Sequence, residues 1–249
     1  MRAALLALAL LGGWELYAQL GSVDDFLLPA PTEIATAAWQ DRSLLWDSFA
    51  VTAQEIAFGL GCALVLALVA ALALHLSTTV RNAVYPLLVA SQTVPIPLLG
   101  VLLVNWFGFG LLPKLVIIAL VCFFPIVVPV LDGLGRVATD QRKLMRTLGA
   151  SRWQLLRHVE APSALPGLFT GAKLSVAIAA IAAILAEQAG TTSGGIGVLI
   201  TQAIAQLETA RAWAAVVVLS LFSIALFGAL ALAERRLVPW ARPSRGTTT

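Results

Sequence analysis

Residues 144–166 read LMRTLGASRWQLLRHVEAPSALP and form the core of a basic segment, 136–166, that is punctuated by glycine and proline. Long apolar runs lie on both sides of this segment. The whole chain is 59% hydrophobic and only 12% charged, with a mean hydropathy of +0.91. Such values, with repeated apolar runs of about 20 residues, are typical of membrane-spanning helices. The sequence therefore predicts an all-α membrane protein with a single domain, 1–249, and one segment built to meet a soluble partner.

Six apolar runs are long enough to cross a hydrocarbon core of about 30 Å as helices. They lie near residues 3–20, 54–76, 83–104, 113–134, 166–186 and 212–233. If both termini lie on the same side of the membrane as the basic segment, most of the 16 lysines and arginines fall on that side. Because these residues mark the cytoplasmic side, we expect both termini and the basic segment in the cytoplasm. Glu55 and Lys114 are then expected at the outer edge.

The first apolar run also has features of a secretory signal, because Arg2 precedes it and a polar stretch follows. Residues 17–19, Tyr-Ala-Gln, do not form the small-x-small pattern that is typical of a cleavage site. An uncleaved first helix is therefore favoured.

A short amphipathic helix is expected between the first two spans. Pro31 and Thr32 suit a helix start, and Trp39 and Trp46 suit the outer membrane interface. No chemistry is assigned to this helix.

Two short helices are expected inside the basic segment, joined by a turn at Gly149. Asp140 suits the first turn of the first helix, and Gly149 suits a left-handed cap at its end. Ser151 is the candidate N-cap of the second helix. Pro162 is expected to stop that helix, and Pro166 to open the fifth span.

The charges of this helix–turn–helix allow two interpretations. Arg146, Arg152 and Arg157 are placed to contact an acidic protein partner. They would equally suit the phosphates of membrane lipid. Charge alone leaves both open.

At these residues the chain resembles the inner-membrane permeases of bacterial ATP-binding cassette importers. Their cytoplasmic loop follows the pattern Glu-Ala-Ala, three residues, Gly, nine residues, Ile-x-Leu-Pro. Gly149 and Pro162 keep that spacing, and Val159 takes the isoleucine position. Lys143 begins the triplet Lys-Leu-Met, which replaces Glu-Ala-Ala and removes its acidic residue. The resemblance covers roughly 29–240.

The resemblance implies that this loop docks into a groove on a separate ATPase. The residues it implicates in coupling are Lys143, Arg146, Gly149, Ala150, Ser151, Arg152, Val159 and Pro162. It also implies a homodimer in the bacterial inner membrane, with ATP-binding subunits and an extracytoplasmic solute-binding protein as partners. Since the chain has no nucleotide-binding loop, we expect the partner subunits to use the ATP. The chain itself is expected to bind no cofactor and to be no enzyme.

Short phrases of sequence point to a branch of that family. LPAPTEI, QTVPIP and NWFGFGLLPK resemble permeases for pyrimidine precursors of thiamine. The nitrate, sulfonate and taurine branch is the alternative. A small polar organic solute is expected in either case.

The third span is expected to contribute to the solute path. Pro95 and Pro97 remove backbone donors near its middle, and irregular backbone is tolerated in a membrane only against protein or a wet cavity. Gln92 and Thr93 would then face the solute. A hydrogen bond to another helix is the alternative for these two side chains.

Two further charged residues are path candidates. Lys173, in the fifth span, either extends to the cytoplasmic surface, faces the path or pairs internally. Glu187 precedes a glycine-rich turn, 190–197, that is expected to lie outside. The resemblance to the importer permeases implies that this turn closes the outer side of the path as a gate.

Small residues recur at every fourth position of the fifth span. They are Gly167, Gly171, Ser175, Ala179 and Ala183. Such a row permits close approach of a second helix at an inclined crossing, with the dimer interface as a candidate location.

Other classes of protein fit less well. A self-contained secondary transporter would want a carboxylate at mid-membrane, whereas Glu15, Asp132 and Glu187 lie toward span ends. No paired catalytic groups are apparent, since His75 and His158 are isolated near the cytoplasmic surface. The two cysteines lie in apolar runs and are expected to pack there, so no metal site is predicted. The basic residues are not interleaved with aromatic ones, which argues against nucleic-acid binding.

Overall fold

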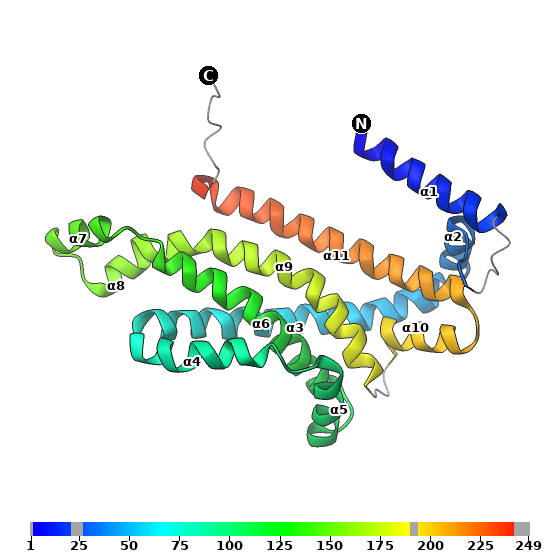
Figure 1. Cartoon of the computed structure of the whole chain (residues 1–249), viewed down its shortest axis with the longest axis horizontal. Helices are drawn as coiled ribbons and strands as arrows, with labels where there is room; N and C mark the ends of the chain where they lie inside the picture. The colour runs from blue at the N-terminus through cyan, green and yellow to red at the C-terminus, as the bar shows by residue number, and fades with distance from the viewer. Residues whose placement is uncertain (1, 21–26, 190–193, 242–249) are drawn as a thin grey trace.

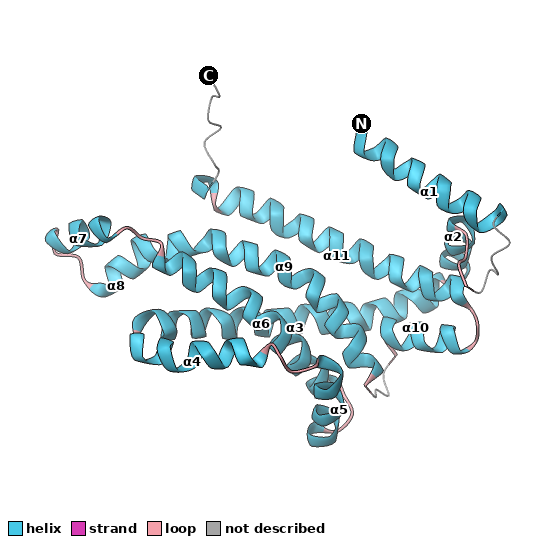
Figure 2. Ribbon diagram, viewed as in Figure 1, coloured by secondary structure: helices cyan, strands magenta, loops and turns pink. Residues whose placement is uncertain are grey.

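The computed structural model describes residues 2–20, 27–189 and 194–241. Within these ranges every regular element is a helix and no strand occurs (Figures 1 and 2). The longer helices pack side by side along the long axis of the molecule (Figure 1). This arrangement confirms the all-α prediction.

Four of the described helices are long and apolar enough to cross a membrane. They are α3 (Arg42–Leu76), α6 (Leu111–Gly135), the continuous helix Arg152–Gln188 and α11 (Thr209–Leu237). A fifth span depends on a bent pair of helices, and α1 (Arg2–Leu20) follows the first predicted span without being among the four. The count of six therefore stays a prediction.

The third predicted span is not one straight helix. It consists of α4 (Thr78–Ser91) and α5 (Ile96–Phe107), whose axes are bent by 100°. Pro95 cannot donate a backbone hydrogen bond and disfavours a helical residue before it. Tight turns replace the helix here, with the Thr93 N–H donating to the Ala90 carbonyl at 3.1 Å. The prolines thus break the span completely, a stronger effect than the loosening expected from the sequence.

The short outer helix forms where it was predicted. α2 (Pro31–Gln40) has proline in its first turn, and the Glu33 carboxylate accepts a hydrogen bond from the Ala30 N–H at 3.0 Å. Its Trp39 is 73% exposed, and the placement of this residue at the outer membrane interface stays a prediction.

The row of small residues in the fifth span packs against α6 of the same chain. A Cβ added at Gly171 would lie 2.5 Å from the Pro125 carbonyl oxygen, so only glycine fits there. Pro129 has no N–H to donate to that oxygen, which leaves it facing α9 (Ala161–Gln188). The dimer interface is therefore not needed to explain this row, although the predicted close helix crossing is present.

α3 approaches the other side of α6 in a similar way. A Cβ at Gly59 would lie 2.6 Å from Ile118 of α6. One turn apart along the same face of α3, Ala63, Ala67 and Ala71 are fully buried. Consequently α6 lies between α3 and α9 and forms the centre of the bundle.

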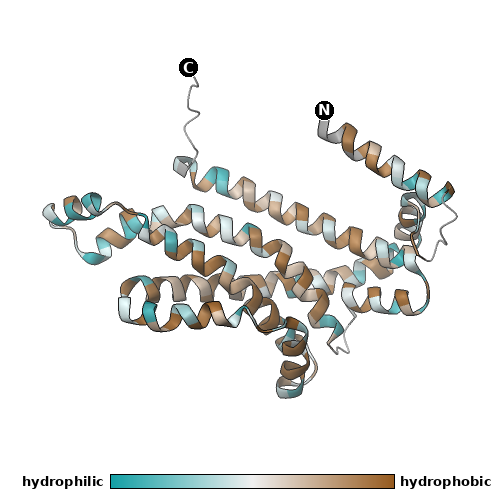
Figure 3. Ribbon diagram, viewed as in Figure 1, coloured by the Kyte–Doolittle hydropathy of each residue, from teal (hydrophilic) through white to brown (hydrophobic). Residues whose placement is uncertain are grey.

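The remaining elements follow the bundle toward the C-terminus. They are α10 (Ile196–Ala205), α11 and the short 3-10 helix η2 (Pro239–Ala241). Arg211 in the first turn of α11 donates to Asp41 at 2.6 Å and so ties α11 to the junction of α2 and α3. α7 (Thr139–Thr147) and α8 (Arg152–Leu155) project at the far end of the molecule, where hydrophilic residues gather (Figures 1 and 3).

Candidate functional site

The turn of the basic segment has the predicted glycine geometry. Gly149 adopts φ +78°, a left-handed conformation that side-chain-bearing residues rarely take. Its N–H donates to the Arg146 carbonyl at 3.0 Å, and the Ala150 N–H donates to the Met145 carbonyl at 3.0 Å. These bonds close the end of α7 as a left-handed cap does.

Ser151 caps the next helix, as predicted. Its hydroxyl accepts a hydrogen bond from the Gln154 N–H at 3.3 Å, and the Gln154 side chain accepts one from the Ser151 N–H at 2.8 Å. This reciprocal pair is a capping box, which sets the direction in which the chain leaves the turn.

Pro162 and Pro166 do not have the predicted roles. α8 passes through a π-helical turn, η1 (Leu156–Glu160), directly into α9, so the helix runs unbroken over 37 residues from Arg152 to Gln188. Pro162 lies immediately after the π turn, where the regular hydrogen-bond pattern is already interrupted and its missing N–H costs little. Pro166 lies within α9. The turn at Gly149 therefore leads directly into a helix long enough to cross a membrane.

Glu160 fixes the basic segment to the bundle. Its carboxylate is 2.9 Å from Nε2 of His75, at the end of α3, and 3.2 Å from Nε of Arg142 in α7. Arg142 also donates to the Leu134 carbonyl of α6 at 3.1 Å. Sequence reasoning missed this cluster, because His75 and Glu160 are 85 positions apart and no local pattern links them.

Most of the predicted coupling residues lie on the projecting turn. Arg146, Gly149, Ser151 and Arg152 are exposed, whereas Ala150, Val159 and Pro162 are partly buried. Lys143 lies 4.0 Å from Asp140 on the same helix, and both side chains are mostly exposed. Such a pair contributes little to stability.

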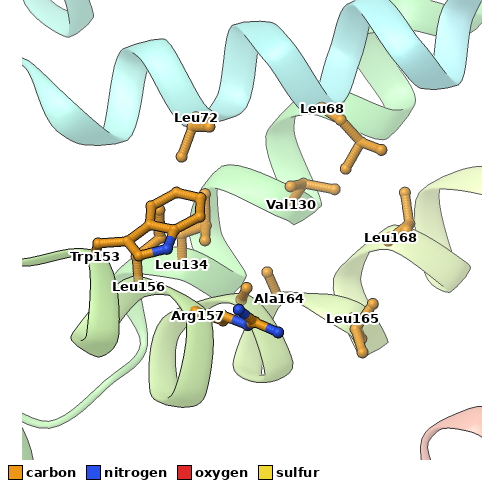
Figure 4. Close-up of a pocket in the computed structure, with 11 residues that line it drawn as sticks. Leu68, Leu72, Val130, Leu134, Trp153, Leu156, Arg157, Ala164, Leu165 and Leu168 are labelled. Atoms are coloured by element: carbon orange, nitrogen blue, oxygen red, sulfur yellow. The ribbon is translucent and has the colours of Figure 1, made fainter.

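An apolar cavity of about 330 Å³ lies between α3, α6 and the helix Arg152–Gln188 (Figure 4). Leu68 and Leu72 of α3 form one wall, and Val130 and Leu134 of α6 form another. The helix Arg152–Gln188 supplies the rest of the lining. Its Trp153 lies at the end that the distribution of basic residues predicts to be cytoplasmic.

The polar residues at the break in the third span keep their hydrogen bonds local. The Thr93 hydroxyl donates to the Ala90 carbonyl at 2.8 Å, and the Gln92 amide reaches only the adjacent Ser91 hydroxyl at 3.4 Å. Gln92 also lines a cavity of about 230 Å³ beside Leu120 of α6. The described contacts therefore give no bond from these two side chains to another helix.

Lys173 pairs internally. Its ammonium lies 2.7 Å from the Glu234 carboxylate of α11, and both side chains are largely buried. Of the alternatives left open by the sequence, the structure shows the ion pair.

Glu187 is buried and holds the start of α10. Its carboxylate accepts hydrogen bonds from the Thr52 hydroxyl and the Gly197 N–H, each at 2.6 Å. The Thr52 oxygen in turn accepts one from the Ile196 N–H at 2.8 Å. A Cβ at Gly195 would collide with the Glu187 carboxylate, which explains a glycine there. Of the predicted gate, 190–193 lies outside the described residues.

A second buried charge pair was missed by the sequence analysis. Lys114 Nζ lies 2.5 Å from Glu55 Oε1, and the two side chains are 1% and 2% exposed. Both were expected at the outer edge. Because α3 begins at Arg42, Glu55 lies about 20 Å along the helix axis, and the position of the pair relative to the membrane edge stays a prediction.

The comparisons with known proteins agree with this architecture. The family of binding-protein-dependent transport system inner membrane components matches residues 63–239, and the chain belongs to that family. It is therefore a permease subunit of an ATP-binding cassette importer, a membrane component that works with ATP-binding subunits and a substrate-binding protein.

Several curated relatives resemble the chain over most of its length. The formylaminopyrimidine transport permease protein ThiX of Halalkalibacterium halodurans is 34% identical over 230 residues, covering 92% of this chain and 91% of the relative. The riboflavin transport system permease protein RibX of Chloroflexus aurantiacus is 34% identical over 91% of this chain and 85% of its own. The taurine transport system permease protein TauC of Escherichia coli is 29% identical over 93% and 86%.

Proposed function

We propose that the exposed turn of the basic segment docks into a cytoplasmic ATPase subunit and couples ATP use to movement of the membrane helices. The observation that carries this proposal is the fixed attachment of the turn. Glu160 ties it to His75 and Arg142, and the helix Arg152–Gln188 continues from it into the bundle. A partner that displaces the turn would therefore displace helices.

The surface of the turn suits a protein groove. Leu144, Leu148 and Trp153 are 60%, 75% and 66% exposed, an unusual set of apolar side chains for a segment rich in arginine. Lys143, Arg146 and Arg152 surround them with positive charge. Apolar contacts with a charged rim are typical of protein interfaces.

The remaining parts of the proposal follow the importer family. The chain, 1–249, forms one permease domain with both termini in the cytoplasm, and two copies form a homodimer. Its surface helices contact membrane lipid. ATP is bound and hydrolysed by the partner subunits, so this chain needs no cofactor of its own. The helices alternate between inward- and outward-open arrangements as the ATPases close and open.

The solute is proposed to be a small nitrogen heterocycle of the pyrimidine-precursor type. Support comes from relatives whose names specify formylaminopyrimidine and riboflavin, both nitrogen heterocycles, at 34% identity. Taurine or another sulfonate is the second candidate, because a permease named for taurine is also similar.

Reconstitution tests these proposals directly. The permease is placed in liposomes with an ATPase subunit and a solute-binding protein from the same organism. We expect uptake only with all three proteins and ATP. We also expect the system to take up a pyrimidine precursor of thiamine better than it takes up taurine. Uptake without ATP or without the partners would instead indicate a self-contained secondary transporter.

A variant of the turn separates docking from folding. Gly149→Trp should abolish stimulation of the ATPase, because a bulky residue cannot take the left-handed conformation that shapes the docking surface. Gly228→Trp is the control, since that glycine has open space around it in α11. Unchanged stimulation in Gly149→Trp, with intact membrane insertion, would contradict the docking role.

A further inference from the structure

A small polar cavity lies between the end of α3 and the helices α7 and α8. Its volume is about 120 Å³, well above the roughly 10–15 Å³ that a cavity needs to hold one water. A tetrahedral oxyanion fits a space of that size. The lining residues are His75, Leu76, Arg142, Arg146, Arg152, Leu155 and Glu160.

Positive charge exceeds negative charge around this cavity. Three arginines face one carboxylate, that of Glu160, whose oxygens already contact His75 and Arg142. Among the described residues, no carboxylate lies within ion-pair distance of Arg146 or Arg152. The guanidinium group of arginine is especially suited to bind phosphate and carboxylate oxygens.

Arg142 has one polar atom whose hydrogen-bonding capacity is not used. Its Nε is buried without an acceptor in hydrogen-bonding geometry, although it lies 3.2 Å from the Glu160 oxygen. A buried N–H without an acceptor is costly and rare in folded proteins. Because this N–H is enclosed, an anion in the cavity would be held by the outer nitrogens of Arg142 and by Arg146 and Arg152.

We propose that this cavity binds an oxyanion of the phosphate type, held by Arg142, Arg146 and Arg152. The phosphate belongs either to a lipid headgroup or to free inorganic phosphate. His75 and Leu76 end a membrane-spanning helix, so the cavity lies where the bilayer surface meets the basic segment. It lies beside the docking turn, whose exposed centre is at Leu148 and Gly149.

A bound oxyanion would hold together α7, α8 and the end of α3, which the Glu160 carboxylate also joins. The oxyanion would bridge α7, through Arg142 and Arg146, to α8, through Arg152, next to the end of α3. The site thus goes beyond the proposed docking function: it would exist in the permease without any ATPase present.

Calorimetric titration of the full-length permease with inorganic phosphate tests the proposal. The protein is held in phosphatidylcholine nanodiscs, and sodium chloride keeps the ionic strength constant. We expect saturable binding that Arg146→Gln and Arg152→Gln each weaken about fivefold or more. Arg157→Gln is the matched control, because Arg157 lines the apolar cavity instead. Glu160→Gln should tighten binding, an effect of opposite sign that misfolding cannot produce.

A second measurement distinguishes the two sources of phosphate. Native mass spectrometry reports whether phosphatidylglycerol stays bound after purification from mixed nanodiscs. Lipid that is retained by the wild type and by Arg157→Gln, but lost from Arg146→Gln, assigns the site to a headgroup even if free phosphate does not bind. The proposal is overturned if neither phosphate nor phosphatidylglycerol binds, or if Arg157→Gln weakens binding as much as the other two arginine variants.

Discussion

The ammonium of Lys114 lies 2.5 Å from the carboxylate of Glu55 in the contact between α3 and α6, with both side chains almost fully buried. Each charge has been removed from water at a large energetic cost, and the pair is stable only because the partner is present. The identity of each of these two residues therefore depends on the presence of the other.

Removing one member of this pair should be strongly destabilising. We expect Glu55→Gln or Lys114→Met to lower the free energy of unfolding by about 3–5 kcal/mol, because the remaining charge stays buried and loses the ionic partner that lay 2.5 Å away. Unfolding in mixed detergent and SDS micelles measures this. The double variant Glu55→Leu/Lys114→Met should recover most of the loss, since apolar residues can replace a buried pair. Additive losses in the double variant would contradict this explanation.

Thr52 should be needed for its hydroxyl and not for its shape. Thr52→Val leaves the Ile196 N–H and one Glu187 oxygen without their partner, and we expect a loss of about 1–3 kcal/mol. Hydrogen exchange at the amides of Ile196 and Gly197 should become faster. Thr52→Ser keeps the hydroxyl and should leave exchange nearly unchanged; equal effects of the two substitutions would argue against the hydrogen bond.

Gly171 should tolerate no side chain. Gly171→Ala places a methyl group 2.5 Å from the Pro125 carbonyl and should push α9 away from α6, at a cost of about 1–3 kcal/mol. Thermal unfolding in detergent measures the change. Gly228→Ala provides the comparison, because a Cβ there meets nothing within 4 Å and alanine favours a helix. The prediction fails if the two variants behave alike.

Glu160 should matter for energy coupling as a positioning residue. In the reconstituted importer, Glu160→Gln should lower uptake about fivefold while ATP hydrolysis falls less, because the docking turn loses its ionic attachment to α3 and α7. The ratio of solute transported to ATP hydrolysed measures this. Asp140→Asn is the control, since that carboxylate is 97% exposed. A proportional fall in both rates would indicate damaged folding or docking instead.

Local features of this fold were predictable from sequence, and long-range ones were not. Gly149, Ser151 and Pro31 act within one helical turn, so their roles follow from backbone conformation and capping chemistry. Pro162 was misjudged because its effect depends on the π turn before it, which no residue pattern announces.

The buried charges show the same limit more clearly. Glu55 and Lys114 are 59 positions apart, and each alone appears as a charge at the edge of an apolar run. Their pairing depends on how far α3 extends beyond its apolar core and on how closely Gly59 lets α6 approach. Those quantities are set by packing, so only the assembled structure shows that the charges meet.

The unbroken helix from Arg152 to Gln188 has a mechanical consequence. At 1.5 Å per residue, its 37 residues form a rod of about 55 Å. Glu160 is near one end of this rod and Glu187 at the other, so each end is fastened to α3 by a carboxylate, at His75 and at Thr52. A tilt imposed at the end near Glu160 would be transmitted to the end near Glu187 without an intervening loop. One continuous helix thus links the two ends of the bundle.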